Sequence, residues 1–382
     1  MGSEVRVQDD PQRLRAWLLL VRAPGVGPAR IREILAHFPD LQDFLSAGPK
    51  AQKASGLLKQ DALDFLAQSD DAILADDFAW LDRADARLFT LADSDYPPLL
   101  RQIADPPPVL YALGDAAALA VPQVAIVGSR NPSRPGRELA EQFAAGLSQV
   151  GFAITSGLAA GIDGAAHEGA LNAGGRTLAV LGTGVDRVYP ANHRDLARRI
   201  VAEGGALISE FPLGTGPNPS HFPRRNRILS GLALGTLVVE AALRSGSLIT
   251  ARQALEQGRE VFAIPGSIHN PLARGCHRLI RDGAKLVESV DDVLEDLEGL
   301  VGYLRAQLDE SVGSAAAEDA TPAASTDEAA LLEALGADPA SIDQLVERSG
   351  LTADRVSSML LALELQGRVL MLPGGRAQVS SR

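Results

Sequence analysis

The stretch Gln123-Val-Ala-Ile-Val-Gly-Ser-Arg130 constrains the fold of this chain more than any other. Its uncharged run is rich in β-branched residues and ends at Gly128, which predicts a strand buried on both faces, as in a parallel sheet. Residues from Pro135 to Val150 then supply a helix. A glycine turn between a buried strand and a helix leaves unpaired amide groups at the positive end of the helix dipole, where anions are favoured. With Arg130 beside it, this turn predicts a phosphate-binding corner.

The alternation of strands and helices continues beyond this corner. We expect buried strands at Val124–Val127, Phe152–Thr155, Thr177–Leu181, Ala206–Ser209, Thr236–Val239 and Val261–Ile264. Helices between them are typical of a doubly wound α/β sheet. Shorter strands are expected at Leu88–Leu91, Val109–Gly114 and Lys285–Val287. The sequence therefore predicts an α/β fold with an extended, Rossmann-like doubly wound sheet.

The first 86 residues predict a helical domain. Apolar residues at helical spacing recur in Arg13–Val21, Ile31–Phe38, Leu57–Leu66 and Asp71–Leu81. Between the first two lies Gly25-Val-Gly27, a turn that resembles the helix-hairpin-helix of DNA-binding proteins. An ordinary tight connection, in which the glycines supply positive φ angles, explains this turn equally well. We expect a SAM-like or helix-hairpin-helix-like domain here.

The end of the chain predicts a linker followed by a winged helix. Residues 306–326 are rich in alanine and serine and cannot bury a core. Helices at Asp327–Leu335, Ser341–Arg348 and Thr352–Gln366 precede two strands, Val369–Leu372 and Ala377–Val379. Three helices and a two-stranded wing form a winged-helix pattern. The predicted parts are 1–86 (helical), 87–305 (Rossmann-like), 306–326 (linker) and 327–382 (winged helix).

Composition narrows the class of protein. A chain of 382 residues with 46% hydrophobic residues is long enough for two or three domains with real cores. The net charge of -12 argues against a globally basic nucleic-acid-binding surface, but it leaves room for a local basic groove. The single cysteine, Cys276, excludes an internal disulfide framework and a cysteine-only metal cluster. We find no signal peptide and no uncharged stretch long enough for a bilayer, and we expect a cytoplasmic protein.

Glycines and hydroxyl side chains follow nearly every predicted strand. Beyond the first strand come Gly128 and Ser129, and the later strand ends carry Ser156, Gly157, Gly161, Ser245, Gly246 and Ser247. Each of these turns alone is explained by an ordinary connection between a strand and a helix. Their coincidence is more informative, because ligands of doubly wound sheets bind beyond the carboxyl ends of the strands. The pattern predicts a groove for backbone phosphates or nucleotides.

The segment His221-Phe-Pro-Arg-Arg-Asn-Arg-Ile228 carries the densest positive charge. A basic cluster of this kind is often a solvated helix start. However, arginines near a helix N-terminus oppose the dipole unless an anion compensates them. Phe222 beside them offers a surface on which a base can stack. We favour a nucleic-acid site, with the alternative that Arg225 or Arg227 holds neighbouring loops through salt bridges.

Candidate catalytic groups have simpler explanations. Asp163 is placed to cap a helix, and His167 lies one turn later, so a cap and a hydrogen bond account for both. Glu240 follows a buried strand and could pair with a groove arginine or orient a loop. No nucleophile has an adjacent base, and no histidine pair has metal-ligand spacing. We expect a binding protein with no catalytic residue, metal or cofactor rather than a hydrolase.

Several ordered motifs together carry a resemblance to a known family. They are Val124–Arg130, Ser156–Asp163 with Ala166-His167, Ala179–Gly184 before Tyr189-Pro190, Phe222–Arg227, Val239–Ala241, Ser245–Thr250 and Ala263–Gly266. The set resembles the DNA-processing protein A (DprA, or Smf) family across the whole α/β part. Many relatives carry an aromatic residue where this chain has Pro135, which removes a stacking contact there.

The resemblance implies a non-enzymatic protein of natural transformation. Such proteins bind incoming single-stranded DNA, form a homodimer and load the recombinase RecA, in some cases displacing single-strand-binding protein. The predicted DNA-binding residues are Gly128, Ser129, Arg130, Ser156, Gly157, Gly161, Phe222, Arg224, Arg225, Asn226, Arg227, Ser245, Gly246 and Ser247.

A nucleotide-binding sensor, or a nucleotide N-glycosidase-like enzyme on a related fold, is the alternative. Glu240 and Ser245-Gly-Ser247 are the features that support it. The hydrolase version of such a loop is denser in glycine and places its glutamate after the glycines, whereas Glu240 precedes them. Because a fold alone does not determine function, release of free base from nucleoside monophosphates is the observation that would favour this alternative.

Overall fold

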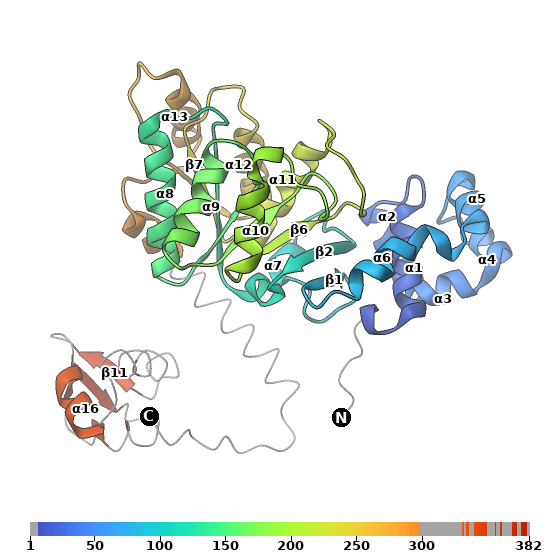
Figure 1. Cartoon of the computed structure of the whole chain (residues 1–382), viewed down its shortest axis with the longest axis horizontal. Coiled ribbons are helices and arrows are strands. Elements are labelled where there is room, and N and C mark those ends of the chain that lie inside the picture. The colour runs from blue at the N-terminus through green and yellow to red at the C-terminus, as the bar shows by residue number, and fades with distance from the viewer. Residues whose placement is uncertain are drawn as a thin grey trace. The chain divides into compact units, whose positions relative to one another are not determined.

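The structure is a computed structural model that describes residues 7–297 and, beyond them, 331, 334–335, 340–349, 356, 360, 369–372 and 376–379. Met1–Leu304 form one compact unit and Arg305–Arg382 a second. In Figure 1 the first unit joins a large α/β part to the N-terminal helices, with β1 and β2 nearest α1 and α6. No helix in the described ranges is long and apolar enough to cross a membrane.

A nine-stranded sheet forms the centre of the first unit, in the order β1-β2-β6-β5-β4-β3-β7-β8-β9. The strands are β1 (Ala86–Thr90), β2 (Val109–Gly114), β3 (Gln123–Gly128), β4 (Ala153–Ser156), β5 (Thr177–Val180), β6 (Ala206–Ser209), β7 (Gly235–Val239), β8 (Glu260–Ala263) and β9 (Lys285–Leu286). All pairs from β6 through β9 are parallel, whereas β1–β2 and β2–β6 are antiparallel. In register, Val124 of β3 lies between Ile154 and Gly235. The predicted doubly wound sheet is confirmed.

Helices cover both faces of this sheet. On one face, Phe143 of α8 (Arg134–Gln149) and Ala165 of α9 (Ile162–Asn172) pack with Ile126 of β3. On the other, α11 (His221–Leu232) and α12 (Ser247–Glu256) pack with β4, β5 and β7. Helices α10 (Arg194–Ala202), which follows β5, and α13 (Arg274–Arg281), which follows β8, complete the layers. Strands β3 to β7 are almost fully buried, which explains their continuous apolar runs.

Six helices precede the sheet: α1 (Pro11–Arg22), α2 (Pro28–His37), α3 (Leu41–Ser46), α4 (Gly48–Ser55), α5 (Gln60–Gln68) and α6 (Ala75–Leu81). The short helices α3 and α4 are additions to the predicted set, and the predicted helix Asp71–Leu81 is divided into a 3-10 turn and α6. Trp17, Ile31 and Phe44 form their fully buried core. Since these helices are too short to be stable alone, their packing on one another and on the sheet maintains them.

The second unit contains α16 (Ile342–Ser349) and a small antiparallel sheet in the order β10-β12-β11. Its strands are β10 (Ala340–Ser341), β11 (Val369–Leu372) and β12 (Arg376–Val379). The predicted hairpin is confirmed, with Val369 opposite Val379, and β10 is an addition to it. The predicted linker 306–326 and, apart from single positions, the helices Asp327–Leu335 and Thr352–Gln366 lie outside the described residues.

Candidate nucleic-acid interface

A pocket of about 640 Å³ opens beyond the carboxyl ends of β3 and β7. We call it the α11 pocket, because α11 forms one wall, the loop after β3 a second, and the loop after β7 with the start of α12 a third. From the predicted set it is lined by Gly128, Ser129, Arg130, Phe222, Arg225, Asn226, Ser245, Gly246 and Ser247. Segments almost 120 residues apart in the chain thus meet at the one edge that the sheet topology predicts.

Two glycines allow the loops at this edge to approach one another. A Cβ on Gly128 would lie 1.9 Å from the carbonyl oxygen of Val239 and 2.7 Å from Cγ1 of Ile162. Gly161 has a φ of +84°, and a Cβ there would lie 2.3 Å from the carbonyl oxygen of Ser129. That same oxygen accepts a hydrogen bond of 3.1 Å from the amide of Ile162. The glycines therefore bring the start of α9 against the loop after β3, which is a requirement for close packing rather than for ligand contact.

Arg130 is an exposed cation of the pocket. Its guanidinium carbon lies 5.8 Å from the centre of the Phe222 ring, and it makes no hydrogen bond or ion pair with any residue in the described part of the chain. The Phe222 ring is in turn 5.7 Å from that of Tyr189, at an angle of 44°. A Cβ on Gly182 would lie only 2.9 Å from the Phe222 ring, so this glycine makes room for the aromatic side chain. A charge that can bind phosphate is thus held beside a ring that can stack with a base.

Arg225 lines the floor of the pocket but is almost fully buried, with 3% of the residue exposed. Its Nη1 donates to the carbonyl of Val180, and its Nε has no hydrogen-bond partner. The guanidinium occupies the space beside Gly157, where a Cβ would lie 2.1 Å from Nη1. Burial lowers the pKa of Arg225 to about 10, while the nearby carboxylate of Asp163 opposes that shift. The side chain remains a cation at neutral pH, next to the carboxylate of Asp163 that lines the same pocket.

Asp163 is the buried counter-charge of Arg225. Burial raises its pKa, and the positive charge of Arg225 and two backbone amides oppose the increase. Those amides, of Gly157 and Ala159, donate to Oδ2 at 3.1 and 3.4 Å. The N-cap of α9 is Gly161, so the predicted capping role of Asp163 is wrong by two positions; its carboxylate instead holds the loop between β4 and α9.

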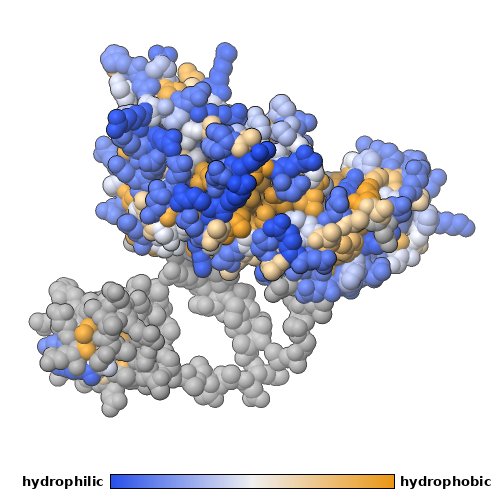
Figure 2. Space-filling view, in the orientation of Figure 1, coloured by the Kyte–Doolittle hydropathy of each residue, from blue (hydrophilic) through white to orange (hydrophobic). Residues whose placement is uncertain are grey.

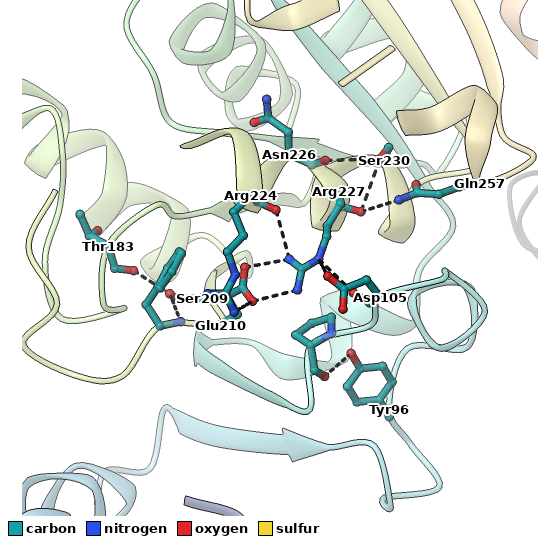
Figure 3. A network of polar contacts seen from close by, with 12 residues as sticks. Tyr96, Asp105, Thr183, Ser209, Glu210, Arg224, Asn226, Arg227, Ser230 and Gln257 are labelled. Atoms are coloured by element: carbon teal, nitrogen blue, oxygen red, sulfur yellow. Dashed lines mark hydrogen bonds and ion pairs between the residues drawn. The ribbon is translucent and has the colours of Figure 1, made fainter. Parts of the chain in front are cut away.

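Arg227 and Arg224 point away from the α11 pocket toward Glu210 (Figure 3). Nη1 and Nη2 of Arg227 donate to the two carboxylate oxygens of Glu210 at 2.7 and 2.8 Å, and its Nε donates to the carbonyl of Asp105 at 2.9 Å. Arg224 also donates to Glu210, at 2.9 Å, although 52% of its side chain is exposed. Arg227 therefore holds neighbouring loops through salt bridges, which is the alternative that the sequence left open.

The predicted serines occupy different environments. Ser156 is fully buried, and its hydroxyl donates to the carbonyl of Ile126 at 2.6 Å, so the structure does not bring it to the pocket surface. Ser245 and Ser247 line the pocket, and their hydroxyl oxygens lie 2.7 Å apart at the start of α12. A helix N-terminus with two hydroxyls is a favourable environment for a phosphate, although the amide of Ser247 already donates to Oγ of Ser245 at 3.3 Å.

Glu240 and His167 have structural partners. The carboxylate of Glu240 accepts from the amide and hydroxyl of Ser133 at 2.7 and 2.6 Å, and from Asn270 at 3.0 Å. It orients the loop before α8, which was one of its two expected roles. His167 is fully buried, its Nδ1 lies 2.7 Å from Oγ1 of Thr177, and burial lowers its pKa to about 3. The bond to Thr177 on β5 replaces the local hydrogen bond that we expected.

Two further side chains of the pocket are absent from the predicted set. Tyr189 is 49% exposed and packs beside Phe222, while Arg244 lines the wall next to Ser245. Both follow predicted strand ends, so their position in the chain was an available signal. Neither belongs to the basic cluster of α11 or to a glycine turn, the two patterns that indicate phosphate contacts in this sequence.

The comparisons with known proteins agree with this fold. A family model described as DNA recombination-mediator protein A matches residues 87–298, and one described as the DprA winged helix domain matches residues 315–375. The Escherichia coli protein Smf is 41% identical over 94% of each chain. The Streptococcus pneumoniae DNA processing protein DprA is 46% identical over 73% of this chain and 96% of that protein.

Two solved structures extend the likeness to three dimensions. The crystal structure of Streptococcus pneumoniae DprA covers 77% of this chain and 98% of its own, with a TM-score of 0.64 and 37% identity. A Helicobacter pylori DprA structure, whose title concerns its single-stranded DNA binding mode, covers 56% of this chain and 96% of its own, with a TM-score of 0.50 and 27% identity. From its sequence, its fold and these matches, the chain belongs to the DNA recombination-mediator protein A family, known as DprA or Smf.

Proposed function

We propose that this protein binds single-stranded DNA in the α11 pocket, protects incoming DNA and loads RecA onto it during natural transformation. The observation that carries the proposal is Arg130, an exposed cation beside the ring of Phe222 and without an ion-pair partner in the described ranges. Guanidinium groups suit phosphates, and aromatic rings stack with bases of any sequence. The single-stranded DNA binding described for the Helicobacter pylori relative supports this assignment.

The proposal includes a homodimer that acts in the cytoplasm without catalysis, alongside RecA and single-strand-binding protein. The family resemblance supports these partners. The state of the candidate catalytic groups supports a binding role, because Glu240 is held by Ser133 and Asn270 and His167 is buried. These same contacts disfavour the nucleotide-hydrolysing alternative, since a catalytic carboxylate must reach its substrate.

The decisive experiment is a gel-shift titration of single-stranded and double-stranded DNA with the parent protein and Arg130→Ala. We expect the parent to prefer single strands of any sequence. The substitution should weaken this binding uniformly. The slope of log K against the logarithm of salt concentration should become shallower by about 0.7, the value for one phosphate on a single strand. Addition of RecA should yield filaments sooner with the parent than with the variant.

The matched control is Arg176→Ala. Arg176 is also an exposed arginine, but it precedes β5 and so lies at the opposite edge of the sheet. The Arg176→Ala variant should bind single-stranded DNA as the parent protein does. If Arg130→Ala binds labelled single strands as tightly as the parent does, then the α11 pocket is not the DNA site.

A further inference from the structure

A second pocket, of about 690 Å³, lies beside the first within the same compact unit. We call it the α10 pocket, because α10 forms one wall. Its other walls are β2, β6, the end of α6 and the loop that follows β5, and its floor is apolar, with Leu113, Val185, Val188, Val201 and Leu207. Figure 2 shows hydrophobic surface gathered over α10, β6 and β2, bordered by hydrophilic side chains. Nothing in the function described above uses this surface.

Arginines surround the apolar floor. Arg83, Arg187, Arg194 and Arg198 line the α10 pocket, against Asp85 and Asp186. This is a local excess of positive charge on a chain whose net charge is -12. Such a rim selects an anionic partner, and arginine is the residue best suited to phosphate.

Two of these arginines are available to a ligand. Arg83 forms two hydrogen bonds with Asp85, at 3.0 and 2.9 Å, and Arg198 pairs with Asp195 at 2.6 Å. Arg187 approaches Asp186 only to 3.8 Å, while that carboxylate accepts from the amide of Gly214. Arg194 has no hydrogen bond or ion pair with any residue that the structure describes.

Tyr189 connects the two pockets. It lines both of them, and its ring lies 5.7 Å from that of Phe222. The loop after β5 carries Tyr189 together with Arg187, and the strand order β3-β4-β5-β6 leads along the sheet edge from one pocket to the other. A polymer that leaves the α11 pocket past Tyr189 therefore enters the α10 pocket directly.

We propose that the single strand continues past Tyr189 into the α10 pocket, where its bases cover the apolar floor and its phosphates contact Arg187 and Arg194. This inference rests on the proposed function. An aliphatic floor with a basic rim would also suit an acidic, apolar peptide. The shared Tyr189 favours DNA, because a peptide site has no reason to adjoin the α11 pocket.

The test compares two oligothymidylates, of about six and about fifteen nucleotides, which span the range of site sizes of single-strand-binding modules. Fluorescence anisotropy measures their affinities at several salt concentrations, with the parent and with Arg187→Ala/Arg194→Ala. The double variant should bind the longer strand more weakly than the parent does. For this strand, the slope of log K against the logarithm of salt concentration should be shallower by about 1.4, which corresponds to two phosphates. The shorter strand, held in the α11 pocket, should bind to both proteins alike.

The matched control is Arg176→Ala/Arg199→Ala. It removes the same charge from before β5 and from α10, but neither residue lines the α10 pocket. A second pair of variants is Ala202→Glu and Ala202→Gln at an exposed pocket position. The carboxylate should weaken binding of the longer strand, and the amide of equal size should have much less effect.

The outcomes separate this inference from the proposed function. Equal binding of the longer strand by the parent and Arg187→Ala/Arg194→Ala would overturn the extension and leave the α10 pocket as a surface for a protein partner. Equal weakening of both strands would also overturn it, because the arginines would then act on DNA in general. Failure of the parent to bind either strand would instead remove the proposed function itself, as would the absence of any effect of Arg130→Ala on the shorter strand.

Discussion

At the scale of single residues, Arg225 and Asp163 place opposite charges in the protein interior under the α11 pocket. Removal of one partner of a buried pair leaves an uncompensated charge, which costs about 3 kcal/mol. We therefore expect Arg225→Met to lower the free energy of unfolding by about that amount. Arg225→Met/Asp163→Asn should recover part of the loss. Urea unfolding followed by circular dichroism measures both, and a double variant less stable than Arg225→Met would contradict the pairing.

His167 makes stability sensitive to acid. Burial lowers its pKa to about 3 from an ordinary value of 6.5, so between these values the unfolded chain binds a proton that the folded chain does not. The stabilising contribution is complete above about pH 6.5 and is lost as the pH falls toward 3, at about 1.4 kcal/mol per unit. His167→Gln should flatten this part of the pH profile of the unfolding free energy. His269→Gln, in an exposed loop, is the control and should leave the profile unchanged.

At the scale of elements, Glu240 ties β7 to the start of α8. Its carboxylate holds Ser133, whose hydroxyl accepts from the amide of Gly136 and caps that helix. Glu240→Ala should lower the free energy of unfolding by about 1 kcal/mol, because partly buried donors lose their acceptor. Glu240 also has a φ of +51°, a conformation that costs a residue other than glycine about 1–2 kcal/mol. Glu240→Gly should therefore be more stable than Glu240→Ala; the reverse order in urea unfolding would contradict this account.

Local sequence predicted the elements better than the contacts between them. The strands from β3 to β8 were predictable because each is a short apolar run ended by glycine or a polar residue. Short helices such as α3 and α4 have too few residues to show a period. The partner of Arg227 was not predictable, since Glu210 becomes its neighbour only when α11 packs across the end of β6. The glycines near the site were predicted as ligand-binding residues. Several of them instead allow loops to pack closely, and this role was not predictable because it depends on atoms elsewhere in the chain.

At the scale of the whole first unit, the N-terminal helices and the sheet share buried polar contacts. Asp77 of α6 is 1% exposed and accepts from Arg22 of α1 at 2.5 Å and from the hydroxyl of Tyr111 on β2 at 2.8 Å. Trp80 packs edge-on against Tyr111, with ring centres 5.7 Å apart. Loss of Asp77 would leave a buried arginine and a buried phenol without their acceptor. The two parts of the unit are therefore expected to unfold together.

The tryptophans make this expectation measurable. The chain has two, Trp17 and Trp80, and both belong to the N-terminal helices, so their fluorescence follows those helices and the contact of Trp80 with Tyr111 of the sheet, while circular dichroism follows all helices. In urea, the two signals of the parent should change together in the range where the sheet unfolds. In Asp77→Ala, the fluorescence transition should occur at a lower urea concentration than the main circular-dichroism transition. The reason is that the substitution lowers the free energy needed to separate the helices from the sheet by about 3 kcal/mol. Asp76→Ala, at an exposed neighbouring position, should keep the transitions together. Since Trp80 also lines the α10 pocket, a parent in which the signals separate would mean that one wall of that pocket forms independently of the sheet.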